Sequence, residues 1–456
     1  MDRTVFADAQ VAATLNDRFV AIRVDADRRP DIAERYSLGG WPTTAFLTPD
    51  GAIAGGGTFV SLERMPEVLE RVLDAFRSRT NELGPASNPE PRLWQNPTQT
   101  SSSTGVPGDV DLVERVYESF DDEHGGFGNA PKFPIAAPLE LALDIFRETR
   151  DARMAHVVQT TLDAIGWGGL YDEVDGGFFR CAATRGWQSP HREKLLDTNA
   201  ALLRLYVDAS EILKTARYRE RAAETLRYAQ TWLADQVDGG WAGSQRADDD
   251  YYAADAPARA ARQAPPIDRA LYASWNGVMF SAVLRAALAI DDTALGEFAL
   301  RSLERVSLGA YKPGAGVAHY VDDGAHVRGL LDDQIAMATA QLDAYDATGN
   351  IVYEMMAQEL VHFALRTMWD EREGGFFDRT VPDEQERVGL MQHRIKPFVS
   401  NCEAARLMRR LAGSCGEHEL LVRADATLSA MAPLAGAQGP LAAHYLLAAR
   451  QKAATA

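Results

Sequence analysis

His191 stands in a segment whose residue types could support acid/base chemistry. Ser189 is a favoured N-cap residue and Pro190 suits the first helical position, so the sequence predicts a helix that begins here. On such a helix His191 shares a face with Leu195 and Leu202, which turns the imidazole toward an apolar interior. The positive end of the helix favours a neutral imidazole, the form that acts as a general base. A buried, hydrogen-bonded structural histidine is the alternative.

Two pairs of carboxylates are further catalytic candidates. Asp332 and Asp333 lie where a helix is predicted to begin. Adjacent helical residues point about 100° apart, so at most one of the two can face a shared site. Complementing the helix dipole is their alternative role. Glu193 and Asp197, four residues apart, could form a glycosidase-like carboxylate pair or could instead bind neighbouring basic residues.

Trp275 and Asn276 form the most carbohydrate-like constellation in the chain. A tryptophan stacks on the C–H faces of sugars, and an asparagine offers both a donor and an acceptor to hydroxyl groups. These residues precede a helix predicted over residues 278–288, and a turn with a packed tryptophan is the alternative. Polar and aromatic residues at other turns are substrate-binding candidates of the same kind: Lys132, Tyr171, Asp172 and Trp187.

Composition and charge narrow the class of protein. The 456 residues contain 47 Lys and Arg against 65 Asp and Glu, a net charge of −18, which makes a nucleic-acid or anionic-membrane partner unexpected. The three cysteines form no CxxC pair and indicate a reducing compartment. No apolar leader or membrane span is apparent, so we expect a cytoplasmic protein. We expect no metal and no cofactor, because His319 and His326 fall in a segment rich in Gly and Pro that predicts a loop, and the glycine clusters fit no nucleotide-binding motif.

The first 80 residues predict a small α/β domain. Helical spacing over residues 8–19, 31–38 and 62–76 alternates with β-branched runs at 20–25 and 43–48 and a weaker strand near 52–54. Residues 81–108 are rich in Pro and Ser and predict a linker.

Residues 109–456 predict an all-helical domain built from repeats. A Gly-Gly-aromatic motif recurs at Gly125, Gly176, Gly239 and Gly374. The last interval is about twice the others, as though one copy had decayed. Two helices fit each repeat, so we expect six helical hairpins closed into an (α/α)6 toroid, with an open solenoid as the alternative.

The motifs together resemble the spermatogenesis-associated protein 20 family, whose members carry a thioredoxin-like domain called DUF255. The similar stretches include Gly40-Trp41-Pro42, Phe46-Leu47-Thr48-Pro49-Asp50-Gly51, Ala130-Pro131-Lys132-Phe133-Pro134, Pro190-His191, Glu193-Lys194, Asn199, Ser274-Trp275-Asn276-Gly277 and Leu331-Asp332-Asp333. The resemblance implies a multidomain α/β plus all-α chain: a thioredoxin-like domain over 1–80, then a six-hairpin toroid over 109–456. It implies an architecture similar to N-acylglucosamine 2-epimerases and glycosidases, adds Lys194 and Asn199 to the substrate-binding candidates, and makes Trp41-Pro42 the loop that faces a redox pair.

The family's CxxC run would precede Met1, so the resemblance implies a domain that lacks its first strand and its redox pair. Three explanations stay open: a misassigned start, a decayed domain, or remaining strands that pair directly. Three functions stay open as well. The first is a carbohydrate-active enzyme that uses His191 with Asp332 or Asp333. The second is a thiol-redox protein with upstream cysteines, and the third is a non-catalytic scaffold that binds a sugar, or a protein through the N-terminal domain.

Overall fold

The structure is a computed structural model that describes Met1 and residues 4–40, 42–80 and 109–451. It divides into two compact units, Met1–Ser102 with Val381–Ile395, and Ser103–Thr380 with Lys396–Ala456. The predicted linker lies outside the described residues.

The first unit packs three helices on a two-stranded sheet. Its elements are α1 (Ala9–Arg18), α2 (Pro30–Tyr36), β1 (Thr44–Leu47), β2 (Ile53–Gly57) and α3 (Met65–Thr80). The strands are antiparallel, and Thr44 lies opposite Gly57. A small core joins Val11 of α1, Phe46 of β1 and Leu69 of α3. The expected helix–strand alternation is therefore present, with one exception.

The strand predicted over residues 20–25 does not form. The segment is irregular, and the side chains of Val20 and Ile22 are 90% and 77% exposed. A strand needs a neighbour for its backbone donors and acceptors, and the described part of this unit places none beside the segment. Its β-branched residues favour a strand, but no neighbouring strand in the described part of the unit pairs with them.

Residues 381–395 were expected within the toroid but pack in the first unit. Arg35 of α2 donates from Nε and Nη2 to the carbonyl oxygen of His393, at 3.1 and 2.8 Å. The hydroxyl of Tyr36 donates to the Gly51 carbonyl at 2.9 Å and accepts from the Leu390 N–H at 3.0 Å. This segment holds two short 3-10 helices, η2 (Glu384–Glu386) and η3 (Gly389–Gln392).

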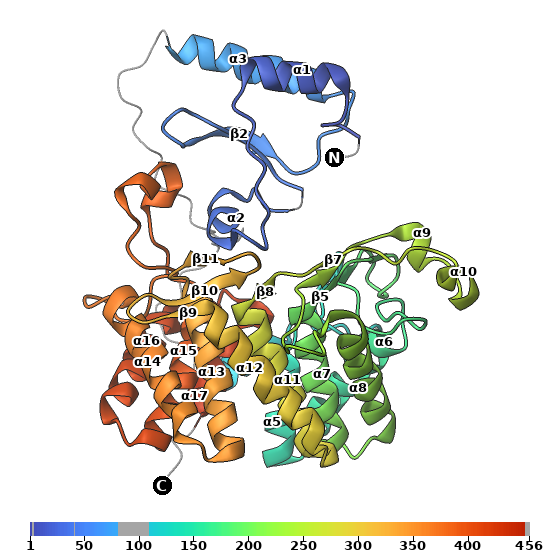
Figure 1. Cartoon of the computed structure of the whole chain (residues 1–456), viewed down its shortest axis with the longest axis vertical. Helices are drawn as coiled ribbons and strands as arrows, with labels where there is room; N and C mark the ends of the chain where they lie inside the picture. The colour runs from blue at the N-terminus through green and yellow to red at the C-terminus, as the bar shows by residue number, and fades with distance from the viewer. Residues whose placement is uncertain (2–3, 41, 81–108, 452–456) are drawn as a thin grey trace. The chain divides into compact units, whose positions relative to one another are not determined.

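The contacts among its helices close the second unit into a ring of helix pairs, which confirms the toroid. In Figure 1 these helices run alongside one another. Six inner helices contact one another in a closed order: α5 (Ala137–Thr149), α7 (Leu196–Ile212), α11 (Ala273–Ile290), α13 (Leu331–Thr348), α15 (Phe398–Cys415) and α17 (Ala442–Arg450). Each pairs with an outer helix: α6 (Ala152–Gly166), α8 (Ala216–Tyr228), α12 (Thr293–Ala310), α14 (Ile351–Met368), α16 (His418–Ala435) and, for α17, α4 (Asp109–Tyr117). The ring therefore closes where its last helix meets its first.

Short strands interrupt the helices that we expected to be nearly continuous. β3 (Cys181–Ala182) pairs with β4 (Pro190–His191), and β5 (Lys194–Leu195), β6 (Ser244–Gln245) and β7 (Ile267–Asp268) form a second sheet. The third sheet contains β8 (Leu271–Tyr272), β9 (Tyr311–Lys312), β10 (Gly316–Val321) and β11 (Ala325–Arg328). The loop predicted around His319 is therefore a β-hairpin. Two short helices, α9 (Asp249–Tyr252) and α10 (Ala256–Ala260), lie between β6 and β7; π-helix η1 (Ala229–Leu233) follows α8, and 3-10 helix η4 (Gly439–Leu441) precedes α17.

Each Gly-Gly-aromatic motif closes the same tight turn. In the first copy the Gly125 N–H donates to the Asp121 carbonyl at 2.7 Å, and both glycines have positive φ. A Cβ on Gly125 would lie 2.6 Å from the Thr160 carbonyl oxygen of the neighbouring helix. The turn thus needs glycine both for its backbone conformation and for the close approach of α6.

In the turns around Phe178, Trp241 and Phe376, an amide side chain on the next inner helix holds the aromatic residue of the turn. Asn199 accepts from the Phe178 N–H at 2.7 Å and donates to the Phe178 carbonyl at 3.0 Å. Asn276 does the same for Trp241, and Asn401 for Phe376. We name this device the amide clamp.

The structure also locates the missing copy of the repeat. Gln334 of α13 accepts from the Val317 N–H at 2.9 Å and donates to the Val317 carbonyl at 3.1 Å. The clamp therefore persists, while a glutamine replaces the asparagine and the β9–β10 hairpin replaces the Gly-Gly turn.

Helix α11 is, in the described part of the chain, long and apolar enough to cross a membrane. It is an inner helix of the ring, and 61% of its apolar window is buried there. Burial in the core accounts for its composition.

Candidate functional site

The clamp residues show which side of each inner helix faces the centre of the ring. Residues two apart on a helix point about 200° apart, so the residue two before each clamp points away from the turn, toward the centre. These positions hold Asp197, Ser274, Asp332 and Val399 at the N-terminal ends of α7, α11, α13 and α15. Residues five and nine after the clamp fall on the same side.

Deeper in the ring, the charges on these inward faces are paired. Glu140 of α5 lies 2.5 Å from Arg406 of α15 and 3.9 Å from Arg204 of α7. Desolvation raises the pKa of Glu140, but the charges of Arg406 and Arg204 prevail and lower it to about 2. One layer further, pairs of 2.8 and 2.7 Å join Arg285 to Asp208 and Arg410 to Asp343. These layers are ion-paired contacts between neighbouring inner helices.

At the N-terminal end of α13 the environment is different. Asp332 pairs with no basic side chain among the described residues, although water reaches it. The surrounding protein removes part of its hydration and raises its pKa, against the hydrogen bond from Ser400. Asp332 therefore combines a raised pKa with the lack of a basic partner among the described residues, and the pKa of Asp197 on α7 is raised as well.

Asp333 faces away from Asp332, as the helical geometry predicts. It is 1% exposed, accepts from the Ser274 N–H at 3.2 Å and lies 3.0 Å from Nδ1 of His319. The buried His319 comes from β10, so Asp333 ties α13 to both α11 and the hairpin. The structure therefore gives Asp332 the position that faces the centre and gives Asp333 a supporting one.

Asp197 occupies the equivalent position on α7. Burial raises its pKa, against the 2.5 Å hydrogen bond from the Thr198 N–H and the charge of Arg180. Glu193, considered with it as a carboxylate pair, lies outside the helix and binds Arg180 at 3.2 Å. Asp197 and Glu193 therefore do not share a helix face.

The helix predicted to begin at Ser189 is wrong. Ser189 adopts φ +53°, Pro190 and His191 form β4, and α7 begins only at Leu196. His191 is exposed opposite Cys181 of β3 and does not face an apolar interior. Pairing with β3 outweighs the local capping signal here, and the expected helix-dipole effect on His191 has no structural basis.

Three of the predicted binding residues, Lys132, Asp172 and Lys194, are buried in the turns. Lys132 donates to the Asp121 carboxylate at 2.7 Å and to the Gly125 carbonyl at 2.6 Å. Lys194 makes the equivalent bonds to Asp172 and Gly176, at 2.7 and 2.6 Å. Burial lowers the pKa of Lys194 to about 8. All of these contacts are internal.

The remaining buried candidates are also occupied by protein contacts. Trp187 is 1% exposed and donates from Nε1 to the His124 carbonyl at 2.8 Å. The buried ring of Tyr171 lies under the Arg221 guanidinium, at 3.6 Å. Asn199 and Asn276 use their side-chain amides as clamps. Whether any of them contacts a ligand stays a prediction.

Trp275 is half-buried in the first turn of α11, which begins at Ala273 rather than at the predicted residue 278. Its ring lies 4.5 Å from that of Tyr272. Part of the indole therefore stays accessible next to Ser274. Trp41 lies outside the described residues, and Pro42 is exposed in a bend.

His319 is the site residue that sequence reasoning missed. The glycines around it masked a strand, Gly316–Val321, whose buried residues include Val317 and His319. Residues 316–320 are all buried, so the strand shows no alternation of buried and exposed residues that could have revealed it.

The cysteines are poor candidates for thiol chemistry. Burial raises the pKa of Cys181, Cys402 and Cys415 above the ordinary value. All three are free thiols, and the thiolate is the reactive form.

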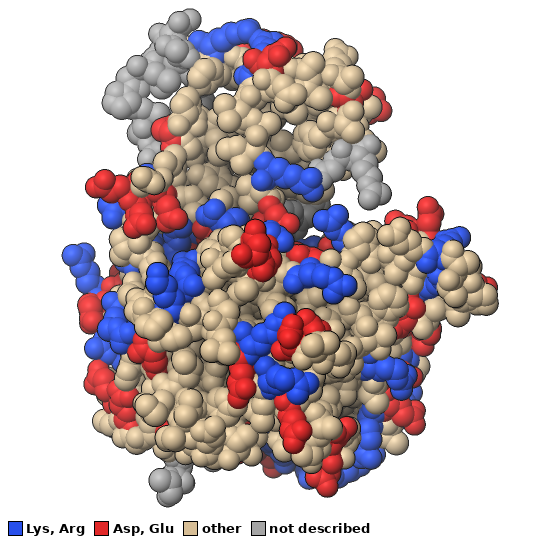
Figure 2. Space-filling view, viewed as in Figure 1, with Lys and Arg blue, Asp and Glu red and all other residues tan. Residues whose placement is uncertain are grey.

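Basic and acidic side chains are interspersed over the face of the ring that Figure 2 shows. This distribution suits a well-hydrated surface more than a phosphate-binding one.

Comparisons with known proteins confirm the resemblance drawn from the sequence. Residues 1–89 match a family model, Thioredox_DsbH, described as a protein of unknown function, DUF255. The chain is 29% identical to spermatogenesis-associated protein 20 of Mus musculus over 274 residues, which covers 54% of this chain and 34% of the relative. It is equally similar to an uncharacterized protein of Caenorhabditis elegans over 276 residues, 54% of this chain and 37% of that one. The matches thus span about a third of the relatives' length.

Several solved structures that share this ring fold have titles that name enzymes acting on carbohydrates. Cellobiose 2-epimerase from Bacillus thermoamylovorans aligns with a TM-score of 0.57 at 10% identity, over 71% of this chain and 85% of that one. A D-mannose isomerase gives 0.56 at 12%, over 72% and 88%. A family 76 glycoside hydrolase from Bacteroides thetaiotaomicron gives 0.54 at 11%, over 75% and 96%. At these identities the likeness shows the (α/α)6 fold alone.

Proposed function

We propose that the toroid binds a carbohydrate at the end of the ring where the inner helices begin, and that Asp332 acts there as an acid/base group. The observation that carries the proposal is the environment of Asp332. It points toward the centre of the ring, has no basic partner among the described residues, and its pKa is raised by lost hydration.

The chemistry follows from that environment. A carboxyl group with a raised pKa can hold a proton closer to neutral pH, which suits transfer to a hydroxyl or glycosidic oxygen. Ring-opening isomerisation, epimerisation and glycoside hydrolysis all need such a transfer. We therefore propose acid/base catalysis on a carbohydrate as the class of reaction, without choosing among these three reactions.

Neighbouring side chains supply the supporting roles. Trp275 offers a partly accessible indole for stacking, and Ser400 donates to Asp332. The Asp333–His319 pair acts as a positioning device, because it ties the first turn of α13 to β10 and to the Ser274 N–H. A charge on His319 lowers the pKa of Asp332.

The experiment compares Asp332→Asn with Asp292→Asn. Asp292 caps the outer helix α12 and accepts from the Leu295 N–H, so its variant controls for loss of a carboxylate at a helix start. Each protein is incubated with a panel of neutral aldoses, ketoses and β-linked or α-linked disaccharides, and turnover is followed by proton NMR in D2O. We expect Asp332→Asn to lower the rate of sugar turnover by about 100-fold or more, and Asp292→Asn to retain that turnover.

Two outcomes contradict the proposal. One is a sugar turnover that Asp332→Asn leaves intact. The other is a panel in which no sugar is turned over or bound saturably by the wild-type chain. Binding without turnover that still depends on Asp332 supports the binding half of the proposal and contradicts the catalytic half.

A further inference from the structure

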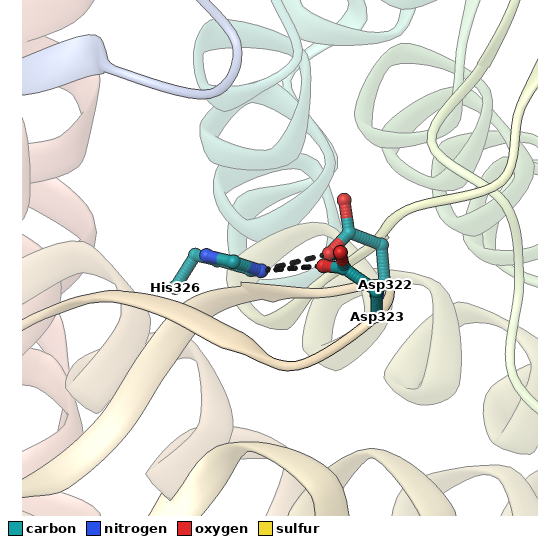
Figure 3. Close-up of side chains that lie close together, drawn as sticks. All are labelled: Asp322, Asp323 and His326. Carbon is teal, nitrogen blue, oxygen red and sulfur yellow. Dashed lines mark hydrogen bonds and ion pairs between the residues drawn. The ribbon is translucent and has the colours of Figure 1, made fainter.

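The tip of the β10–β11 hairpin gathers three side chains with metal-ligating atoms. The turn joins Val321 to its partner Ala325, and the Asp322 N–H donates to the Gly324 carbonyl at 3.1 Å. This turn places Asp322 and Asp323 beside His326, which stands on the returning strand (Figure 3).

One nitrogen of His326 faces both carboxylates. Its Nε2 lies 2.9 Å from Oδ1 of Asp322 and 2.9 Å from Oδ1 of Asp323. The imidazole ring is stacked on Tyr320, with centroids 4.9 Å apart and an interplanar angle of 18°. The stacking fixes the plane of the ring, so that Nε2 keeps its direction toward the two oxygens.

The convergence is better suited to a cation than to a proton. A protonated Nε2 has one N–H, which can serve two carboxylates only by sharing. A cation at the same point is attracted by two carboxylate charges and accepts the nitrogen lone pair. The imidazole also distinguishes among cations, because Mg²⁺ and Ca²⁺ prefer oxygen ligands whereas first-row transition ions bind imidazole well.

The spacing of the ligand atoms matches a transition-metal site. Two ligands bound at about 2.0–2.1 Å and at right angles to each other lie about 2.9 Å apart. Both nitrogen–oxygen distances have this value, and the three ligand atoms lie within 4.8 Å of one another. The three atoms are therefore close enough to bind one ion together, with further coordination positions left for water.

We propose that Asp322, Asp323 and His326 form a site for a divalent first-row transition ion such as Zn²⁺ or Mn²⁺, with open positions for water or a ligand oxygen. Because the site is exposed, it exchanges its metal readily and binds it less tightly than a buried four-ligand site. The site is separate from Asp332, so it stands or falls independently of the function proposed above.

The test is a Zn²⁺ titration of the full chain by calorimetry after treatment with a chelator. The variants are His326→Gln and Asp323→Asn, and the matched control is His156→Gln. His156 is an exposed histidine that lies 3.3 Å from one carboxylate, that of Asp122. We expect the wild type and His156→Gln to share a saturable site that His326→Gln and Asp323→Asn each weaken about tenfold or more.

Two further readouts sharpen the test. Mn²⁺ should show a bound signal by electron paramagnetic resonance that Zn²⁺ displaces and that millimolar Ca²⁺ leaves in place. Far-UV circular dichroism verifies that each variant is folded, which its exposed position favours.

Three results would overturn the proposal. The first is Zn²⁺ binding that His326→Gln and Asp323→Asn leave unchanged. The second is the absence of a saturable site that distinguishes these variants from the control. The third is displacement of Mn²⁺ by Ca²⁺ without any effect of His326→Gln, since that pattern requires carboxylates alone.

Discussion

Replacing Asn199 by Ala tests the amide clamp, the device that repeats around the ring. The backbone of Phe178 forms no ladder bonds of its own, because the flanking bonds run from the Asp172 N–H to the Gly177 carbonyl and from the Phe179 N–H to the Leu170 carbonyl. The Phe178 N–H and carbonyl are bonded to the Asn199 side chain, at 2.7 and 3.0 Å. Asn199→Ala leaves both groups buried without that partner.

The size of the loss follows from these two groups. A buried backbone group without a partner costs about 1–3 kcal/mol, so the variant should lose about 2–6 kcal/mol in the free energy of unfolding. A third bond, from Asn199 to the Leu195 carbonyl at 2.8 Å, adds little, since that carbonyl also lies in the first turn of α7. The exposed Asn350 is the matched control. It caps α14 by accepting from the Val352 N–H at 3.1 Å, and its loss should cost about 1 kcal/mol.

Urea unfolding followed by tryptophan fluorescence and by circular dichroism measures both variants against the wild type. The urea midpoint should be highest for the wild type, slightly lower for Asn350→Ala, and lower by a clearly larger amount for Asn199→Ala. Equal losses in the two variants, or an Asn199→Ala protein as stable as the wild type, would refute the clamp as the device that holds the turn.

Three further outcomes are expected. Glu140→Gln should destabilise the ring by about 2–3 kcal/mol at pH 7, because the folded-state pKa of Glu140, about 2, lies below the ordinary 4.5. This stabilisation is present above pH 4.5 and is lost as the pH falls toward 2. The urea midpoints of the variant and the wild type should therefore converge near pH 2. Asp332→Asn should have a higher urea midpoint than the wild type at neutral pH, because a raised pKa means that the ionised Asp332 destabilises the folded state once the pH rises past 3.8. If the two midpoints differ by the same amount at pH 3, the pKa of Asp332 is not raised. Lys132→Met should cost about 1–3 kcal/mol by leaving the Gly125 carbonyl without its buried donor, since Arg185 still pairs with Asp121, whereas Met at the exposed Lys312 should be nearly neutral in thermal unfolding.

Repetition made the ring predictable from the sequence. The Gly-Gly-aromatic turn recurs with little variation because its positive φ angles and the close approach of a helix tolerate only glycine. The copy around Val317 was not predictable. Its clamp, Gln334, keeps the hydrogen bonds while the turn itself is replaced by a hairpin.

The errors came from local signals that distant segments outweigh. Ser189 and Pro190 predict a helix start, but ten residues earlier in the chain β3 offers a pairing partner and His191 joins a strand instead. Residues 20–25 have a strand's composition, but no strand among the described residues pairs with them. Likewise, Lys194 and Asn199 have the residue types of a binding site, and only the fold shows that their polar groups bond within the turns.

For the site, the sequence predicted the start of α13 and the divergence of Asp332 from Asp333, because both follow from helix geometry. It did not predict His319, since the pairing of β10 with β8 joins segments far apart in the chain.

The most direct test of the account is the pH profile of saturable sugar binding or turnover in the wild type, beside Asp332→Asn and Asp292→Asn. We predict that binding or turnover shows an acid/base transition in the wild type and in Asp292→Asn, at a pH above the ordinary range of an aspartate. This transition should be lost in Asp332→Asn. The same transition in all three proteins would contradict a role for Asp332 at the centre of the ring.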